Sequence, residues 1–106
     1  MDAAVIQKTI LIVDDDAKNR AHLSLLLKSE GYLTFEAQSG EAALQWATTE
    51  KPDLILLDAM MPGMDGFQVA AELKAADATR AIPIIMVTSL SGRESRLAAL
   101  QSGVEE

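Results

Sequence analysis

A continuous apolar run that ends in a carboxylate lies at residues 54–58, with the sequence LILLD. Similar apolar runs lie at residues 10–13 (ILIV) and 84–87 (IIMV), each directly before polar residues. Strands buried on both faces of a parallel sheet carry such continuous runs, whereas half-exposed strands alternate. We therefore expect these three segments to be central parallel strands. The sequence LTFEA at residues 33–37 alternates, which predicts a strand nearer the sheet edge.

Segments with helical spacing and capping residues separate the four expected strands. We expect helices over residues 17–30 and 40–49, a third after Asp65, and a fourth beginning at a capping box at Ser91. The expected apolar faces are Leu23, Leu26 and Leu27 in the first helix, Ala43, Leu44 and Ala47 in the second, and Val69, Ala70 and Leu73 in the third. The order is β-α-β-α-β-α-β-α, which predicts a doubly wound α/β fold with helices on both faces of a parallel sheet.

The composition fits one domain without disulfides. Of 106 residues, 49% are hydrophobic and 4% aromatic, with a mean hydropathy of +0.14, which favours an aliphatic core. The absence of cysteine excludes disulfides and thiolate metal sites.

The net charge of −7 repels phosphate backbones and anionic lipids, so we expect no direct nucleic-acid binding and no membrane partner. No apolar run approaches the roughly 20 residues that span a bilayer, and no signal-peptide pattern begins the sequence, so we expect a cytoplasmic location.

Polar residues follow three of the expected strands at the edge where parallel strands end. Asp14 and Asp15 follow the first apolar run, Asp58 follows the third strand and Thr88 the fourth. Ligands bind at this edge of doubly wound sheets, where a switch point makes the first and third strands neighbours. Close carboxylates repel one another unless a cation lies among them, and Mg²⁺ prefers oxygen ligands that include carboxylates. These residues predict a Mg²⁺ site beside a carboxylate nucleophile that can form an aspartyl phosphate.

Two of these segments resemble a known family. The sequences VDD at residues 13–15 and LDAMMPGMDG at residues 57–66 resemble the response-regulator receiver family of two-component signal transduction. The second motif is highly specific, and the order of elements together with Thr88 and Gly103 extends the resemblance over nearly the whole chain. The resemblance implies a flavodoxin-like doubly wound parallel sheet and a phosphoacceptor function.

The resemblance also implies a role for each matching residue. Asp58 is expected to accept the phosphoryl group and Thr88 to hydrogen-bond it. Asp15, Asp58 and the backbone carbonyl of Met60 are expected to ligate Mg²⁺ directly, with Asp14 acting mostly through bound water. The phosphoryl donor would be a sensor histidine kinase or a histidine phosphotransfer protein, and phosphorylation would switch the surface around the fourth helix. Such a signalling domain catalyses only its own phosphoryl transfer and dephosphorylation.

The sequence departs from the family pattern at one end. The pattern continues into a fifth strand with a phosphate-binding lysine and then a fifth helix, whereas this sequence ends at Glu106. We therefore expect residues 1–106 to form a receiver domain with four of the five βα units. Without that lysine the transferred phosphoryl group is less stabilised, which leaves open a phosphorylation-independent interaction module as an alternative function. The uncovered edge of the fourth strand also predicts a homodimer or an exchange of elements between copies.

Some residues near the motifs have a structural interpretation that competes with a functional one. Asp16 and Asp65 are expected to cap helices, and Pro62, Gly63 and Gly66 to shape the loop after the third strand. Trp46 and the methionines are expected to be packing groups, although the side chains of Met60 and Leu90 could tune access to the phosphoryl site.

Other functional classes fit the residues less well. His22 is the only histidine, and without cysteine it cannot complete a transition-metal site, so we expect a structural or surface role. A hydrolase of the haloacid-dehalogenase type also uses a strand-end aspartate, but the motif of that family is Asp-x-Asp. In this sequence Ala59 and Met60 follow Asp58, so the second aspartate of that motif is missing. Nucleotide binding is disfavoured because no glycine-rich phosphate loop follows any expected strand.

Overall fold

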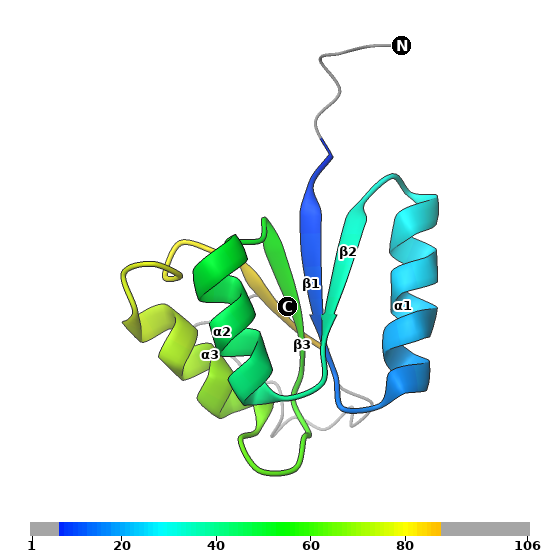
Figure 1. The fold of residues 1–106 in the computed structure, drawn as a ribbon. Helices are drawn as coiled ribbons and strands as arrows, with labels where there is room; N and C mark the ends of the chain where they lie inside the picture. The colour runs from blue at the N-terminus through cyan, green and yellow to red at the C-terminus, as the bar shows by residue number, and fades with distance from the viewer. Residues whose placement is uncertain (1–6, 88–106) are drawn as a thin grey trace.

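The computed structural model describes residues 7–87, in which strands and helices alternate as the sequence predicts (Figure 1). The strands are β1 (Thr9–Val13), β2 (Leu33–Ala37), β3 (Leu54–Asp58) and β4 (Ile84–Val87). The helices are α1 (Ala17–Ser29), α2 (Gly40–Glu50) and α3 (Gly66–Ala75). The expected fourth helix and Thr88 lie outside the described residues.

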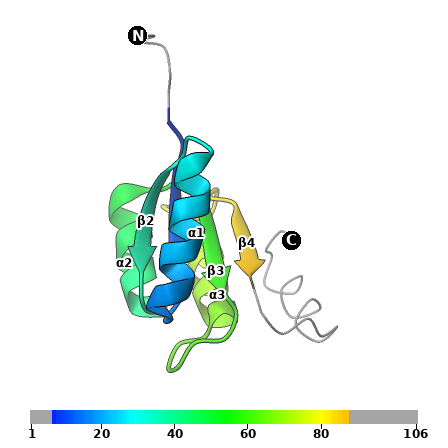
Figure 2. The same cartoon turned by 90° about the vertical axis from the view of Figure 1, so that its right-hand side faces the viewer.

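The four strands form one parallel sheet in the order β2-β1-β3-β4. Figure 2 shows the arrows of β2, β3 and β4 pointing in the same direction. The prediction that β1 and β3 are neighbours is confirmed, with Val13 paired to Leu57. The prediction that β2 lies at the sheet edge is also confirmed. The crossover from β2 past β1 to β3 creates the switch point at which ligands bind in this class of fold.

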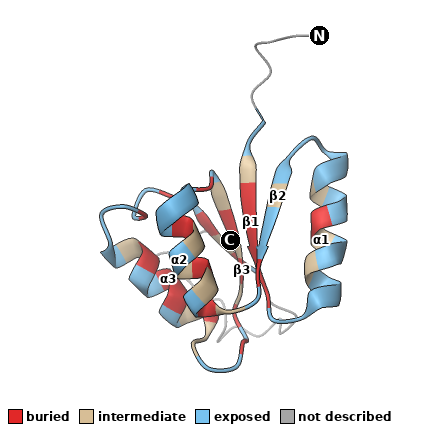
Figure 3. Cartoon of the chain, in the orientation of Figure 1, coloured by how far each residue is buried: buried red, intermediate tan, exposed pale blue. Residues whose placement is uncertain are grey.

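Helices lie on both faces of the sheet, which confirms the doubly wound α/β class (Figure 1). Helices α2 and α3 cover one face and pack against each other there. Their expected apolar residues are confirmed as part of this interface, and the buried ones are Ala43, Ala47, Val69, Ala70 and Leu73. Figure 3 shows this burial between the two helices and the strands. This layer is the main core, and it fixes the ends of β1 and β3 relative to each other.

The face that carries α1 is less completely covered than the sequence predicts. Strand β1 is buried on both faces, but Leu54 and Leu56 of β3 and Ile85 of β4 are only partly buried. These three side chains line a cavity of about 610 Å³ that α1 borders with Leu27. The expectation of two-sided burial is therefore confirmed for β1 and wrong for β3 and β4. The reason is that α1 packs against β1 and β2, and no described helix lies over β3 and β4 on this face.

The predicted apolar face of α1 is also partly wrong. Leu23 and Leu27 are half-buried, but Leu26 is 51% exposed, and the one buried residue of the helix is Ser24. The Ser24 hydroxyl shares a hydrogen bond with Thr34 of β2, so this contact is polar. None of the helices in residues 7–87 has the length and apolar character needed to cross a bilayer.

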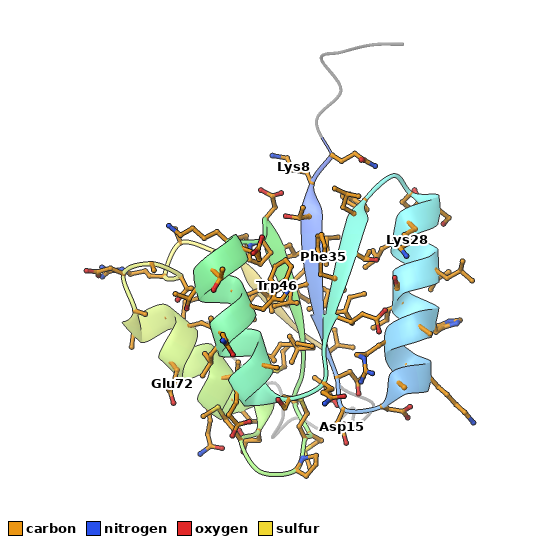
Figure 4. All side chains as sticks on the ribbon, viewed as in Figure 1. Lys8, Asp15, Lys28, Phe35, Trp46 and Glu72 are labelled. Carbon is orange, nitrogen blue, oxygen red and sulfur yellow. The ribbon has the colours of Figure 1, made fainter. Side chains whose placement is uncertain are left out.

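The caps predicted at Asp16 and Asp65 are confirmed, and the capping box predicted at Ser91 lies outside the described residues. The side chain of Asp16 accepts a hydrogen bond from the Lys18 amide, and Ser39 caps α2 in the same way. Gly31 follows α1 with a φ of +96°, in the left-handed region that glycine adopts without strain. Trp46 packs against Phe35 of the edge strand with ring centroids 4.7 Å apart, which confirms its packing role (Figure 4).

Candidate functional site

Three carboxylates gather at the carboxyl edge of the sheet. One oxygen atom from each of Asp14, Asp15 and Asp58 lies within 4.8 Å of the other two. Figure 4 marks Asp15 directly beyond the end of β1, at this edge. Asp14 is 7% exposed, Asp58 is half-buried and Asp15 is exposed, so the cluster runs from the protein interior to solvent. The structure therefore brings together the three acidic residues that the sequence selects.

The sheet register explains why these side chains meet. Val13 pairs with Leu57 across the parallel strands β1 and β3, so Asp14 and Asp58 follow at matching positions. The Asp14 amide donates to the Ala37 carbonyl over 3.1 Å, which ties the end of β1 to the end of β2. The two apolar strands thus fix the acidic residues that follow them.

Backbone amides orient two of the three carboxylates. The Met60 amide donates to Asp58 Oδ1 over 3.1 Å, and the Asp16 amide donates to Asp14 Oδ1 over 2.9 Å. Within residues 7–87, Oδ2 of each of these carboxylates receives no backbone hydrogen bond. One oxygen of each of these two carboxylates is therefore held by a backbone amide.

Burial and the two neighbouring carboxylates disfavour the ionised form of Asp58. Partial burial, followed by repulsion from Asp14 and Asp15, raises the pKa of Asp58 to about 6, although the Met60 amide works in the opposite direction. A cation among the carboxylates would remove this repulsion and favour the ionised form of Asp58. The arrangement is thus suited to a small oxygen-seeking cation.

A cavity of about 320 Å³ adjoins Asp14 and Asp58. Its other lining residues are Asn19, His22 and Leu23 of α1, together with Met60 and Val87. Asn19 and Leu23 were not predicted as lining residues. The available signal is that Asn19 lies three residues before His22 and four before Leu23, and positions three and four apart share a helix face. His22 is exposed, as predicted, although it also borders this cavity.

The loop after β3 is shaped by glycine, as the sequence predicts. Gly63 has a φ of +77°, and Gly66 donates from its amide to the Ala59 carbonyl over 3.1 Å. Asp65 caps α3 in a reciprocal capping box with Gln68 and is not part of the acidic cluster. The Met60 side chain is 55% exposed beside the cavity. Thr88 and Leu90 lie outside the described residues.

Comparison with known proteins identifies the family. Residues 10–106 match the family model described as the response regulator receiver domain. The chain belongs to this family. This receiver domain is 45% identical over 97 residues to the response regulator PleD of Caulobacter vibrioides. The matched region covers 92% of the chain and 21% of PleD. It is 39% identical over 102 residues to the phosphate regulon transcriptional regulatory protein PhoB of Pseudomonas aeruginosa, covering 96% of the chain and 44% of PhoB.

Solved structures agree with the fold of this receiver domain. The chemotaxis protein CheY4 of Vibrio cholerae superposes with a TM-score of 0.87 at 28% identity, over 93% of this chain and 82% of CheY4. The N-terminal domain of a response regulator receiver protein from Methanoculleus marisnigri superposes with a TM-score of 0.85 at 36% identity, over 92% and 80% of the two chains. The receiver domain spans less than half the length of both PleD and PhoB.

Proposed function

We propose that this receiver domain accepts a phosphoryl group on Asp58 from a sensor histidine kinase or a histidine phosphotransfer protein, in a reaction that requires Mg²⁺. The observation that carries the proposal is the set of three carboxylate oxygens within 4.8 Å at the end of β1 and β3. Asp58 is the acceptor in this proposal because it lies in the motif that resembles the family and is half-buried beside a cavity.

The donor atoms fit Mg²⁺. This ion takes oxygen ligands, usually from one or two carboxylates with several waters, and it commonly bridges to phosphate. Asp15 and Asp58 would ligate it directly with the Met60 carbonyl, and Asp14 mostly through water. Burial is the main cause of the raised pKa of Asp58, and repulsion from Asp14 and Asp15 adds to it; a cation among the three carboxylates would relieve that repulsion, which supports this assignment. The exposure of Asp15 leaves room for the remaining water ligands.

The proposed reaction is a displacement at phosphorus. One oxygen of ionised Asp58 forms a bond to phosphorus while the bond from phosphorus to the donor imidazole nitrogen breaks, and that nitrogen keeps the electron pair. In the metal-free protein at neutral pH, a carboxyl with a pKa of about 6 is mostly ionised, and a bound cation would favour the ionised form further. The Met60 amide donates to Oδ1 of Asp58 and so orients the carboxylate beside the cavity. Bound Mg²⁺ would supply charge neutralisation on the transferring group.

The proposed output is a shift between two conformations. A phosphoryl group on Asp58 adds charge and acceptor oxygens beside the proposed position of Thr88, whose hydroxyl gains by moving toward it. The loop over residues 89–92 and the surface of the fourth helix would follow, as a pre-existing equilibrium biased by phosphate. The domain would catalyse only its own phosphorylation and dephosphorylation.

The experiment is incubation with Mg²⁺ and a small phosphodonor such as acetyl phosphate, followed by intact mass measurement. We expect the addition of one phosphoryl group that is lost in Asp58→Asn and in excess chelator. Asp77→Asn is the matched control, because Asp77 is an exposed aspartate whose recorded contact is an ion pair with Arg80. An adduct that persists in Asp58→Asn would reject Asp58 as the acceptor, and sustained turnover of a phosphomonoester would indicate a hydrolase.

A second candidate function is a phosphorylation-independent interaction module that binds a second copy of the chain. The partly exposed side chains of Leu54, Leu56 and Ile85 favour it, because they line a mainly apolar cavity beside β4, which pairs only with β3 among residues 7–87. Unpaired edges and apolar patches are templates for association. Sedimentation at increasing concentration tests this function, and a monodisperse monomer with a normal Asp58 adduct would reject it.

A further inference from the structure

We propose that Arg20 is a positioning residue for the Mg²⁺ site, and that it acts through the backbone of Asp14. The proposal rests on the function proposed above. Arg20 lies on α1, and its Nη1 donates to the Asp14 carbonyl oxygen over 2.8 Å. Its Nε donates to Glu36 Oε1 over 3.1 Å. One side chain therefore joins α1, the end of β1 and the edge strand β2.

The burial of this side chain separates it from ordinary surface ion pairs. The Arg20 side chain is 14% exposed, whereas the other arginine that forms an ion pair in the described residues, Arg80, is 62% exposed. Its two acceptors are a backbone carbonyl and a carboxylate, which suit the planar, forked guanidinium. Hydrogen bonds from a charged donor are stronger than neutral ones, so both contacts restrain the acceptors.

The contact reaches the metal site through the peptide that joins Asp14 to Asp15. This peptide unit is planar, so its carbonyl oxygen and the Cα atom of Asp15 move together. The Asp14 amide is already held by the Ala37 carbonyl over 3.1 Å. Arg20 holds the other side of the same residue, which leaves the chain little freedom to rotate before Asp15. Asp15 is exposed, so the direction of its backbone strongly influences where its carboxylate lies.

We therefore expect the loss of Arg20 to change Mg²⁺ affinity more than the rate of phosphoryl transfer to Asp58. Groups that orient metal ligands typically change affinity by 10- to 100-fold when they are removed. The Arg20 side chain hydrogen-bonds to Asp14 and Glu36, and it does not line the cavity beside Asp58. Once Mg²⁺ is saturating, the positions of the ligands are imposed by the ion itself, and the loss of Arg20 should matter little.

The test is Mg²⁺ titration by calorimetry on the folded protein, with thermal unfolding in chelator measured in parallel. We expect Arg20→Met, which keeps an apolar stem, to raise the Mg²⁺ dissociation constant about tenfold. Arg20→Lys restores a positive donor that can serve one acceptor at a time, so its constant should lie between the two. Arg80→Met is the matched control and should change the constant less than about twofold, because its ion pair is exposed.

A second readout separates positioning from general stability. In Arg20→Met the Mg²⁺ concentration for half-maximal phosphorylation by acetyl phosphate should rise with the dissociation constant, while the rate at saturating Mg²⁺ stays within about twofold of wild type. If Arg20→Met fails to fold, Arg20→Lys and Glu36→Ala carry the same comparison. Wild-type Mg²⁺ affinity in Arg20→Met, or in both substitutes if Arg20→Met does not fold, overturns the inference. A lowered phosphorylation rate at saturating Mg²⁺ with unchanged Mg²⁺ affinity also overturns it. A wild-type protein that binds no Mg²⁺ overturns the proposed function instead.

Discussion

Gly66 lies directly against the backbone of Asp58. A Cβ atom at position 66 would stand 2.2 Å from the Asp58 carbonyl oxygen and 2.8 Å from the Cα atom of Ala59. The Gly66 amide also donates to the Ala59 carbonyl, so the start of α3 is hydrogen-bonded to the residue after the proposed acceptor. The close approach of two backbones at this point leaves no space for a side chain.

Gly66→Ala should therefore lower stability and disturb the acidic site together. Displaced atoms are backbone and cannot rotate away, so we expect a loss of about 2 kcal/mol or more in the free energy of unfolding. The Mg²⁺ affinity should fall as well, because Asp58 moves with its own carbonyl. Urea unfolding and calorimetry measure the two effects. Gly63→Ala is the control, since a Cβ there meets open space and only the positive φ is strained, at a cost of about 1 kcal/mol. Equal losses in both variants would contradict the steric explanation.

The stability of the metal-free protein should depend on Asp58 in a defined pH window. The pKa of Asp58 is raised from 3.8 to about 6 in the folded state, so the folded protein holds this proton more tightly than the unfolded chain. The contribution of Asp58 to stability is fully present below pH 3.8 and is lost as the pH rises through about 6. Above that pH the ionised carboxylate destabilises the fold by about 1 kcal/mol, a value reduced for its partial exposure.

Asp58→Asn should consequently stabilise the protein at pH 7.5 in chelator by about 1 kcal/mol, and should leave it unchanged near pH 3.5. Saturating Mg²⁺ should reverse the order of the two proteins, because the ion binds the folded wild type more tightly than the variant. Urea denaturation at the two pH values, with and without Mg²⁺, measures this difference. A variant that is less stable than wild type at pH 7.5 in chelator would show that burial and repulsion from Asp14 and Asp15 do not destabilise ionised Asp58.

The sequence was sufficient to predict the strands, which depend on local patterns, and the parallel sheet with its acidic cluster, which follow from the alternation of strands and helices. Apolar runs mark the strands, and strand-end carboxylates must meet once β1 and β3 pair. The position of α1 was less predictable. Apolar spacing placed Leu26 on the inner face, but the buried residue is Ser24, which is bound to Thr34 on β2. Arg20 was missed as well, because its contact with the Asp14 carbonyl depends on the path of a loop and leaves no periodic signal.

Substitutions in α3 and α1 test which face of the sheet contributes more to the stability of the fold. Leu73 of α3 is 1% exposed in the main core, whereas Leu26 of α1 is 51% exposed. Leu73→Ala should cost about 2–5 kcal/mol, because it leaves a cavity among packed side chains. Leu26→Ala should change the free energy of unfolding by about 0.5 kcal/mol or less, as expected for a surface position. Urea unfolding of both variants measures the contrast. A large loss in Leu26→Ala would mean that this residue is covered in solution, for example by a second copy.

Asp65 separates capping from metal binding among the acidic residues near the site. Its Oδ1 accepts from the Gln68 amide over 2.9 Å, and Gln68 Oε1 accepts from the Asp65 amide over 2.9 Å. Asp65→Ala removes this cap, so we expect a loss of about 1 kcal/mol in the free energy of unfolding with an unchanged Mg²⁺ dissociation constant. Asp65→Ser retains a capping oxygen and should recover most of the stability. Asp15→Ala should behave in the opposite way, with weakened Mg²⁺ binding and little loss of stability, because Asp15 is exposed and belongs to the acidic cluster. A loss of Mg²⁺ affinity in Asp65→Ser, which keeps the cap but removes the carboxylate, would show that Asp65 contributes charge to the site.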